Sequence, residues 1–305
     1  MTRVAAMDLG SNTLRLLVAD VQDSRWVAVE RGLATPRLGR GLQAGGQLHP
    51  QAREAARRQA AALAEQARGL GATRVTLAAT QACRLAVDGP NLVDQLARDL
   101  VLNRTRVLSG QEEARLSRLG SLSRLTGERR GALLADVGGG SCEVVDLDND
   151  AAPGSSLPLG AVSLSEGHLP SDPPSPSQMR TLSQAVAEGL RPLTGHHCSR
   201  LVASAGTATT LASLVLGLTN YQPEAVNNLL VSRARLQQEL GRLAGLPLEA
   251  RRHLPGLESA RADIIISGLA ILLGLLEVLG LAELTVMDAG LLEGILLDDL
   301  AANGA

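Results

Sequence analysis

The stretch ADVGGGSCE, residues 135–143, joins two apolar runs at 132–135 and 144–147. Each run has the length and composition of a strand, so the glycines between them predict a hairpin turn without obstructing side chains. Backbone N–H groups in such a turn bind phosphate, and a neighbouring carboxylate can hold a cation. Taken alone, the stretch is more typical of an ordinary glycine-rich turn.

A second copy of this pattern lies near the start of the chain, where residues 8–13 read DLGSNT. The shared spacing aligns three pairs of residues: Asp8 with Asp136, Gly10 with Gly138, and Thr13 with Ser141. Each copy joins two strand-like runs. The repeat predicts two homologous half-molecules whose loops face each other across a cleft.

The composition limits the architecture and the class of partner. A chain of 305 residues suits two domains, each with its own core. Aromatic residues make up only 1% of the chain, so the cores must consist of Leu, Val, Ala and Ile. The 29 basic residues are all arginine and the net charge is −2, which gives no indication of a nucleic-acid partner. A polyanion site would need a local group of arginines, whose guanidinium pairs with two phosphate oxygens at once.

The cysteines and the amino-terminal sequence favour one cellular compartment, the cytoplasm. Three cysteines far apart in the sequence, Cys83, Cys142 and Cys198, argue against a disulfide framework and favour a reducing cytosol. The adjacent His196 and His197 lack the usual spacing of metal ligands. No secretory signal pattern precedes the first strand, so we expect a cytoplasmic protein.

One apolar stretch, residues 264–281, has the composition of a membrane span. Glu277 lies inside it, and Arg261 and Asp263 precede it. We therefore interpret it as a helix buried at a domain centre or between subunits. The interpretation predicts no membrane association and a homodimer formed through helices of the second domain.

The hydrophobic pattern predicts an α/β protein with a mixed sheet in each half. Strands are expected at 4–7, 14–19, 26–29, 74–79, 105–108, 132–135, 144–147, 155–162, 201–204 and 284–288. Helices are expected at 51–70, 91–100, 177–190 and 291–300, with others beginning at 111 and 207. A short hinge is expected near residues 120–131.

A third glycine turn contains Gly206 and Thr207, between a strand and a helix. Exposed N–H groups at the helix start favour an anion, but an ordinary turn capped by threonine has the same pattern. The turn lacks the Gly-Lys-Ser/Thr of a P-loop, and the chain has no Gly-x-Gly-x-x-Gly after a strand.

Two neighbouring glutamates begin the helix expected from residue 111. Ser109 and Glu112 fit a Ser-x-x-Glu capping box, which accounts for Glu112. Glu113 has no such role, so it is equally consistent with a general base and with a solvated first-turn acid. Arg84 follows a strand end and fits either a phosphate ligand or a surface ion pair. Arg37 and Arg40 carry the same ambiguity.

Five motifs stand in the order of a known family, at residues 8–13, 79–84, 109–116, 136–141 and 206–210. In these motifs the chain resembles the exopolyphosphatase/guanosine pentaphosphate phosphohydrolase (Ppx/GppA) family of the actin-like ATPase and sugar-kinase superfamily. The resemblance implies two ribonuclease H-like domains with the active site in the cleft between them. Domain I would comprise residues 1–120 and 289–305, and domain II residues 121–288, as in the short two-domain members.

The resemblance also implies roles for individual residues. Glu113 would activate the attacking water, and Asp8, Asp136 and Glu143 would position Mg²⁺ or another divalent cation. The substrate-binding residues implied are Gly10, Ser11, Asn12, Thr13, Arg84, Gly138, Gly139, Gly140, Ser141, Gly206 and Thr207. The chain departs from many relatives at Leu292, at Asn227-Asn228 and at Arg40.

The leading hypothesis is therefore an exopolyphosphatase that releases terminal orthophosphate from inorganic polyphosphate with the help of magnesium. Hydrolysis of guanosine pentaphosphate is an alternative with the same chemistry. A nucleotide-binding or alarmone-binding regulator without catalytic activity is an alternative from another class, and a sugar kinase of the same fold is a third.

Overall fold

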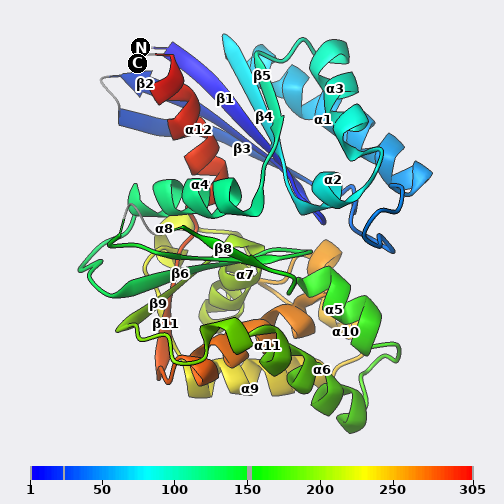
Figure 1. Ribbon diagram of the computed structural model, residues 1–305, viewed down its shortest axis with the longest axis vertical. Helices are drawn as coiled ribbons and strands as arrows, with labels where there is room; N and C mark the ends of the chain where they lie inside the picture. Colours follow the sequence, from blue (N-terminus) through cyan, green and yellow to red (C-terminus); the bar gives the residue numbers. More distant parts are fainter. Residues whose placement is uncertain (1, 23–24, 150–152, 304–305) are drawn as a thin grey trace. The chain divides into compact units, whose positions relative to one another are not determined.

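The computed structural model describes residues 2–22, 25–149 and 153–303. The chain divides into two compact units, each built around a mixed β-sheet (Figure 1). Unit 1 comprises Met1–Ser123 together with Gly290–Ala305, and unit 2 comprises Arg124–Ala289.

Unit 1 has the strand order β3-β2-β1-β4-β5. Its strands are β1 (Thr2–Leu9), β2 (Leu14–Gln22), β3 (Arg25–Ala34), β4 (Arg74–Ala79) and β5 (Arg104–Val107). Its helices are α1 (Pro50–Gly69), α2 (Gln81–Leu85), α3 (Gly89–Asp99), α4 (Gly110–Leu122) and α12 (Leu291–Ala302). Strands β1, β2 and β3 form an antiparallel meander, while β4 and β5 run parallel to β1.

The two faces of this sheet bury different apolar clusters, because successive strand residues point to opposite faces. Met7, Leu16 and Leu77 pack with α1 and α3, whereas Ala6 and Leu17 pack with α4 and α12. Figure 1 shows the two helix pairs on opposite sides of the sheet. Unit 1 is therefore a three-layer α/β unit, and α12 completes it from the far end of the chain.

Helices α4 and α12 approach each other so closely that two positions exclude any side chain. A Cβ atom on Gly120 would lie 1.8 Å from the carbonyl oxygen of Gly290, and one on Gly294 would lie 1.9 Å from that of Leu116. Both distances are far below van der Waals contact. Glycine at these positions is therefore a requirement of the helix crossing.

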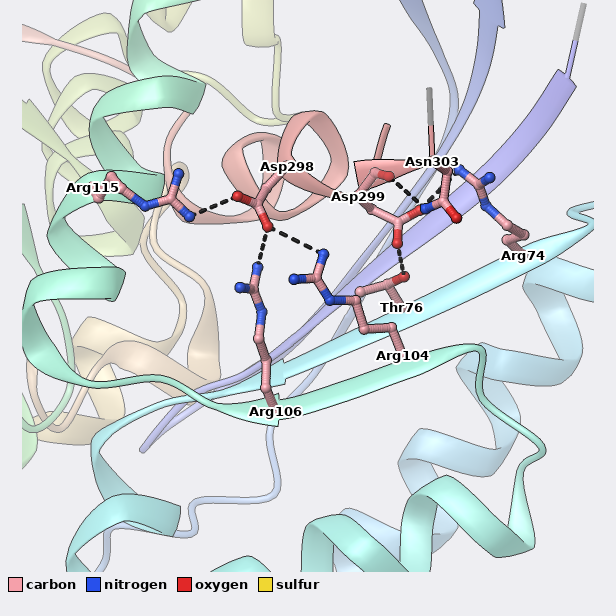
Figure 2. A network of polar contacts seen from close by, with 8 residues as sticks. All are labelled: Arg74, Thr76, Arg104, Arg106, Arg115, Asp298, Asp299 and Asn303. Atoms are coloured by element: carbon pink, nitrogen blue, oxygen red, sulfur yellow. Dashed lines mark hydrogen bonds and ion pairs between the residues drawn. The ribbon is translucent and has the colours of Figure 1, made fainter. Parts of the chain in front are cut away.

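The polar side of α12 is fixed by arginines. Figure 2 shows Arg104, Arg106 and Arg115 pointing at the carboxylate of Asp298, with N···O distances of 3.3, 2.7 and 2.6 Å. These arginines come from β5 and α4. Burial raises the pKa of Asp298, but the hydrogen bond from Arg115 and the charge of Arg106 outweigh it, so its pKa lies below the ordinary value. The next residue is bound as well, since Asp299 accepts hydrogen bonds from Thr76 and Arg74 at 2.9 and 3.0 Å.

We expect Asp298→Asn to lower the free energy of unfolding by about 2 kcal/mol at pH 7, because three arginines lose their charged acceptor. The wild-type contribution is present above about pH 4 and is lost as the pH falls through the lowered folded-state pKa. The variant should therefore lose less stability than the wild type between pH 5 and pH 3. Urea unfolding at several pH values measures this, with the exposed Asp94→Asn as control. If the free energy of unfolding depended on pH equally in Asp298→Asn and in the wild type, Asp298 would not be the charged acceptor that stabilises the fold.

Unit 2 has the strand order β10-β11-β9-β6-β7-β8. Its strands are β6 (Ala132–Val137), β7 (Cys142–Asp146), β8 (Ser155–Leu157), β9 (Arg200–Ser204), β10 (Leu230–Ser232) and β11 (Glu283–Val286). Its helices are α5 (Ala161–His168), α6 (Pro176–Gly189), α7 (Ala205–Leu216), α8 (Pro223–Val226), α9 (Arg233–Ala244), α10 (Leu248–Arg252) and α11 (Ile265–Val278), with short 3₁₀ turns at Arg191–Leu193 and Ser259–Arg261.

The order β8-β7-β6-β9-β11 of unit 2 repeats the order β3-β2-β1-β4-β5 of unit 1, with the same parallel and antiparallel pairings. Unit 2 adds β10 at one edge, antiparallel to β11. The expected fold class, an α/β chain with a mixed sheet in each half, is confirmed. Cys83, Cys142 and Cys198 are free thiols, in agreement with the sequence.

Most of the apolar stretch 264–281 forms α11 (Ile265–Val278), which is buried in the core of unit 2. Leu269, Ile271 and Leu272 are completely covered by neighbouring side chains. Within the described ranges of the chain, no helix has both the length and the apolarity needed to cross a membrane.

One predicted strand was wrong in its second half. The expected strand 155–162 ends at Leu157, and α5 begins at Ala161. The backbone N–H groups of Ala161 and Val162 donate to carbonyl oxygens of the preceding glycine loop at 3.0 and 2.7 Å. Because those N–H groups are bound to the loop, they are not available to a sheet. Strand β10 and the short helix α2 were also not predicted.

Candidate active site

The first glycine loop closes the β1–β2 hairpin. The N–H of Gly10 donates to the carbonyl oxygen of Thr13 at 2.8 Å. A Cβ atom on Gly10 would lie 3.2 Å from that oxygen, so the turn is closed most easily with glycine. The carbonyl oxygens of Ser11 and Asn12 accept from the backbone of Gly39 and Arg37. The loop is therefore fixed on both sides.

The second loop has the same closure. The N–H of Gly138 donates to the carbonyl oxygen of Ser141 at 2.9 Å. Gly160 lies directly against this loop, since a Cβ atom there would be 2.3 Å from the carbonyl oxygen of Gly139. The first N–H groups of α5 bind the carbonyls of Gly138 and Gly139. Those bonds engage carbonyl oxygens that would otherwise repel an anion near the loop.

The two hairpins differ in charge at one equivalent position. Asp8 lies directly opposite Arg15, and Asp136 lies directly opposite Glu143. Residues facing each other across an antiparallel pair share one side of the sheet and interact. Arg15 donates two hydrogen bonds to Asp8 Oδ2, at 2.9 and 2.6 Å. The first hairpin thus carries an ion pair where the second places two carboxylates side by side.

The carboxylates of Asp136 and Glu143 fit a divalent cation. Both are buried, and Glu143 Oε1 accepts a hydrogen bond from Ser156 at 2.6 Å. The neighbouring Cys142 packs in the apolar core of unit 2, and burial raises the pKa of its thiol well above the ordinary value, with the charges of Glu143 and Asp136 adding to the effect. No cluster of three or more His, Cys, Asp or Glu residues arranged for a metal occurs in the part of the chain that the structure describes. Mg²⁺ is commonly held by one or two carboxylates together with water and substrate phosphates, which matches this pair.

The roles of the paired glutamates on α4 are separate. The Ser109–Glu112 capping box is confirmed, because Ser109 Oγ accepts from the Glu112 N–H while Glu112 Oε2 accepts from the Ser109 N–H. Two hydrogen bonds from Ser109 lower the pKa of Glu112, and the bond from the backbone N–H has a larger effect than the bond from the side chain. The buried Glu113 carboxylate instead pairs with Arg84 at 3.1 Å.

Arg84 is itself held in place. Its Nη1 donates to the carbonyl oxygen of Leu108 at 2.6 Å as well as to Glu113. The residue belongs to α2, in which Cys83 is buried, and burial raises the pKa of that thiol to about 12. Two candidates separated by 29 positions in the sequence thus form one ion pair, in which a fixed guanidinium orients a carboxylate.

The third glycine turn joins β9 directly to α7. The Thr207 hydroxyl donates to the carbonyl oxygen of Val137 at 3.3 Å, which ties the turn to the strand before the second loop. The guanidinium of Arg261 covers Gly206, since a Cβ atom there would be 1.8 Å from Arg261 Nη1. Arg261 in turn donates to Glu258 at 2.8 Å. The open side of this glycine is therefore occupied by a cationic side chain.

The structure thus distributes the predicted site residues between the units. Unit 1 holds the first loop, Asp8, Arg84 and Glu113, and unit 2 holds the second loop, Asp136, Glu143 and the Gly206–Thr207 turn. The sequence pattern did not identify Arg15 or Gly160 as site residues, and it gave Arg261 no role at the Gly206 turn. Arg15 had a detectable signal, because it and Glu143 both stand seven residues after the aspartate of their repeat.

The departures from the family pattern have structural roles here. Leu292 lies in the apolar cluster between the sheet and α12. Asn228 accepts from the Thr126 N–H and donates to the carbonyl oxygen of Arg124, at 3.0 and 3.2 Å. Its φ of 62° is a left-handed conformation that asparagine tolerates better than most residues. Asn227 accepts from the Asp288 N–H at 2.9 Å.

Comparison with known proteins identifies the family of the chain. The model of the Ppx/GppA phosphatase family matches residues 17–303. Exopolyphosphatase 2 of Mycobacterium tuberculosis is 33% identical over 313 aligned positions, which cover 97% of this chain and 98% of the relative.

Solved structures agree as well. The Ppx/GppA family member of Aquifex aeolicus is 25% identical with a TM-score of 0.82, covering 100% of this chain and 99% of the other. An exopolyphosphatase from Cytophaga hutchinsonii has a TM-score of 0.88 at 22% identity over 99% and 98% of the two chains, and it supports the fold. The chain therefore belongs to the Ppx/GppA phosphatase family and is a phosphate-releasing hydrolase of the actin-like ATPase fold.

Proposed function

We propose that the protein is an exopolyphosphatase that removes terminal orthophosphate from inorganic polyphosphate. The observation that carries the proposal is the buried Glu113 carboxylate, which Arg84 orients at 3.1 Å while the neighbouring Glu112 is used by the helix cap. The printed name of the M. tuberculosis relative, similar over nearly the whole chain, supports the choice of substrate.

In this proposal Glu113 accepts a proton from a water molecule as the water oxygen bonds to the terminal phosphorus atom. The bond between that phosphorus and the bridging oxygen breaks, and its electron pair leaves with the shortened chain. Arg84 fixes the direction of the Glu113 carboxylate. Backbone N–H groups of the two glycine loops neutralise charge on the phosphoryl oxygens, since phosphoryl transfer depends mainly on positioning and electrostatics.

A divalent cation fits this scheme at Asp136 and Glu143. When bound there, it would offset the negative charge of the phosphate chain and of the two carboxylates. The family resemblance also implies Asp8 as a cation ligand. Asp8 forms an ion pair with Arg15, however, and the guanidinium offsets the charge of the carboxylate. We infer that Asp136 and Glu143 contribute most to cation binding, and that Asp8 mainly stabilises the first hairpin.

Orthophosphate release from long-chain polyphosphate and from guanosine pentaphosphate, measured side by side with Mg²⁺, tests the proposal. We expect kcat/KM to be at least about tenfold higher for polyphosphate, a preference equivalent to about 1.4 kcal/mol. Higher kcat/KM for guanosine pentaphosphate would favour the alternative hydrolase. Tight binding of guanosine tetraphosphate without turnover of either substrate would favour a regulator.

A cytoplasmic homodimer is also part of the proposal. Free thiols at Cys83, Cys142 and Cys198 support a reducing compartment. The apolarity of α11 no longer supports the dimer by itself, because that helix is buried within unit 2. A dimer would need another surface, and sedimentation equilibrium would measure its presence.

A further inference from the structure

We propose that a pocket in unit 1 is an accessory subsite for phosphate groups of the polyphosphate chain, away from the phosphoryl group that is transferred. The inference rests on the proposed function for the identity of the chain. The pocket has a volume of about 560 Å³. Its lining consists of Pro36, Arg37, Arg40, Gly41, His49, Gln51 and Ala52.

The lining is cationic and contains no carboxylate. Arg40 is exposed, and its side chain makes no hydrogen bond or ion pair with any part of the chain that the structure describes. Arg37 is the second arginine of the lining. The Nδ1 of His49 accepts from the Gln51 N–H at 3.3 Å, so a neutral His49 carries its proton on Nε2 and presents a donor there. The lining therefore offers hydrogen-bond donors and positive charge to an anion.

The start of α1 adds to this charge. The helix has 20 residues, begins with Pro50 and has no acidic side chain in its first turn. Gln51 and Ala52, which line the pocket, belong to that turn. The positive end of the helix dipole is thus not offset by its own sequence, and it favours an anion at the same place as the arginines.

The segment that forms one wall of the pocket, residues 36–41, is hydrogen-bonded to the first glycine loop. Arg37 donates its backbone N–H to the carbonyl oxygen of Asn12 at 3.1 Å, and Gly39 donates to that of Ser11 at 2.7 Å. A Cβ atom on Gly39 would lie 2.8 Å from the Ser11 Cβ, so the two segments are in direct contact. An anionic chain held at the first loop would therefore find further positive charge in the adjoining wall.

The pocket is held in a fixed form by core contacts and by Asp88. The Asp88 carboxylate accepts from the Leu48 N–H at 2.9 Å and from Arg53 of α1 at 3.2 Å. Leu38 and Leu48, on either side of the loop, are buried in the cluster of α1 and α3. The backbone N–H of Gly45 donates to the carbonyl oxygen of Leu85 in α2, and the Gly46 carbonyl oxygen accepts from the N–H of Val87. A preorganised cationic pocket loses little entropy when an anion binds.

Arg40→Ala should raise KM for long-chain polyphosphate about tenfold, because one charge-assisted hydrogen bond to a phosphate strengthens binding by about that factor. The kcat value should stay unchanged, because Arg40 does not contact the phosphoryl group that is transferred. KM for tripolyphosphate should stay near the wild-type value, since a short chain bound for hydrolysis does not reach the accessory subsite. Arg40→Glu should raise KM for the long chain further. Arg58→Ala is the matched control, because Arg58 is an exposed arginine of α1 outside the pocket.

Direct binding separates this inference from the proposed function. Titration with long-chain polyphosphate, without turnover, should give about tenfold weaker binding for Arg40→Ala than for Arg58→Ala. If the protein hydrolyses polyphosphate but Arg40→Ala and Arg58→Ala show equal binding and equal KM, the accessory subsite is wrong and the proposed function stands. Weaker binding in Arg40→Ala by a protein that does not hydrolyse polyphosphate would support the subsite and overturn the proposed function. An equal rise of KM for tripolyphosphate in Arg40→Ala would place Arg40 at the reacting phosphates and contradict an accessory role.

Discussion

Glu113→Gln is expected to lower kcat for orthophosphate release by about 10²–10⁴-fold, the usual contribution of a positioned general base. Glutamine has the same shape and can still meet Arg84, but it cannot accept a proton from water. KM should change little, because the proposed role of Glu113 is in the transition state rather than in substrate binding. Steady-state phosphate release from long-chain polyphosphate at neutral pH measures both constants.

Glu112→Gln provides the matched control, since the same substitution is made one residue earlier on the same helix. Glutamine can replace glutamate in a capping box, so this variant should fold and retain near wild-type turnover. Retained binding of polyphosphate by Glu113→Gln would show that the substrate site of the variant is still intact. Turnover by Glu113→Gln close to the wild-type value would remove Glu113 from the mechanism.

Gly294→Ala is expected to lower the free energy of unfolding by about 3 kcal/mol or more. The added methyl group would lie 1.9 Å from the carbonyl oxygen of Leu116, in the backbone of the opposing helix. No rotamer change can relieve this contact, so α4 and α12 must separate along their crossing. Gly120→Ala should have a similar effect, because its methyl group would meet the Gly290 carbonyl at 1.8 Å.

Gly241→Ala is the control for this prediction. Gly241 lies inside α9, and a Cβ atom there would meet nothing within 4 Å. Alanine should therefore stabilise the helix by about 0.5–1 kcal/mol, in the opposite direction to Gly294→Ala. Urea unfolding followed by circular dichroism compares the variants. A stability of Gly294→Ala equal to that of the wild type would mean that the two helices can separate without cost.

The neighbouring glutamates Glu112 and Glu113 differ in how far local spacing determines their contacts. Spacing alone assigned Glu112 to the helix cap, because a capping box needs only residues within one turn. The partner of Glu113 could not be read in the same way. Arg84 lies 29 residues away on α2, and only the fold brings its guanidinium within 3.1 Å of the carboxylate.

The predictions for residues 158–162 and for the Gly206 turn were incomplete because both segments contact residues that are distant in the sequence. Residues 158–162 have the apolar pattern of a strand, yet Gly160 must lie against the second loop and Ala161 must donate to it. The anion-binding interpretation of Gly206 did not include Arg261, which covers that glycine from a position 55 residues further on. Local pattern contains no information on either neighbour.

The sequence by itself determined the repeat, most of the strands and helices in each half, the family and the helix cap on α4. These features depend on periodicity and on short spacings, which are local properties of the chain. Only the tertiary structure decided that Asp8 pairs with Arg15 while Asp136 faces Glu143, and that Arg37 and Arg40 line a pocket joined to the first loop. Strand register and close packing set these contacts, because they place side chains from different segments within a few ångströms of one another.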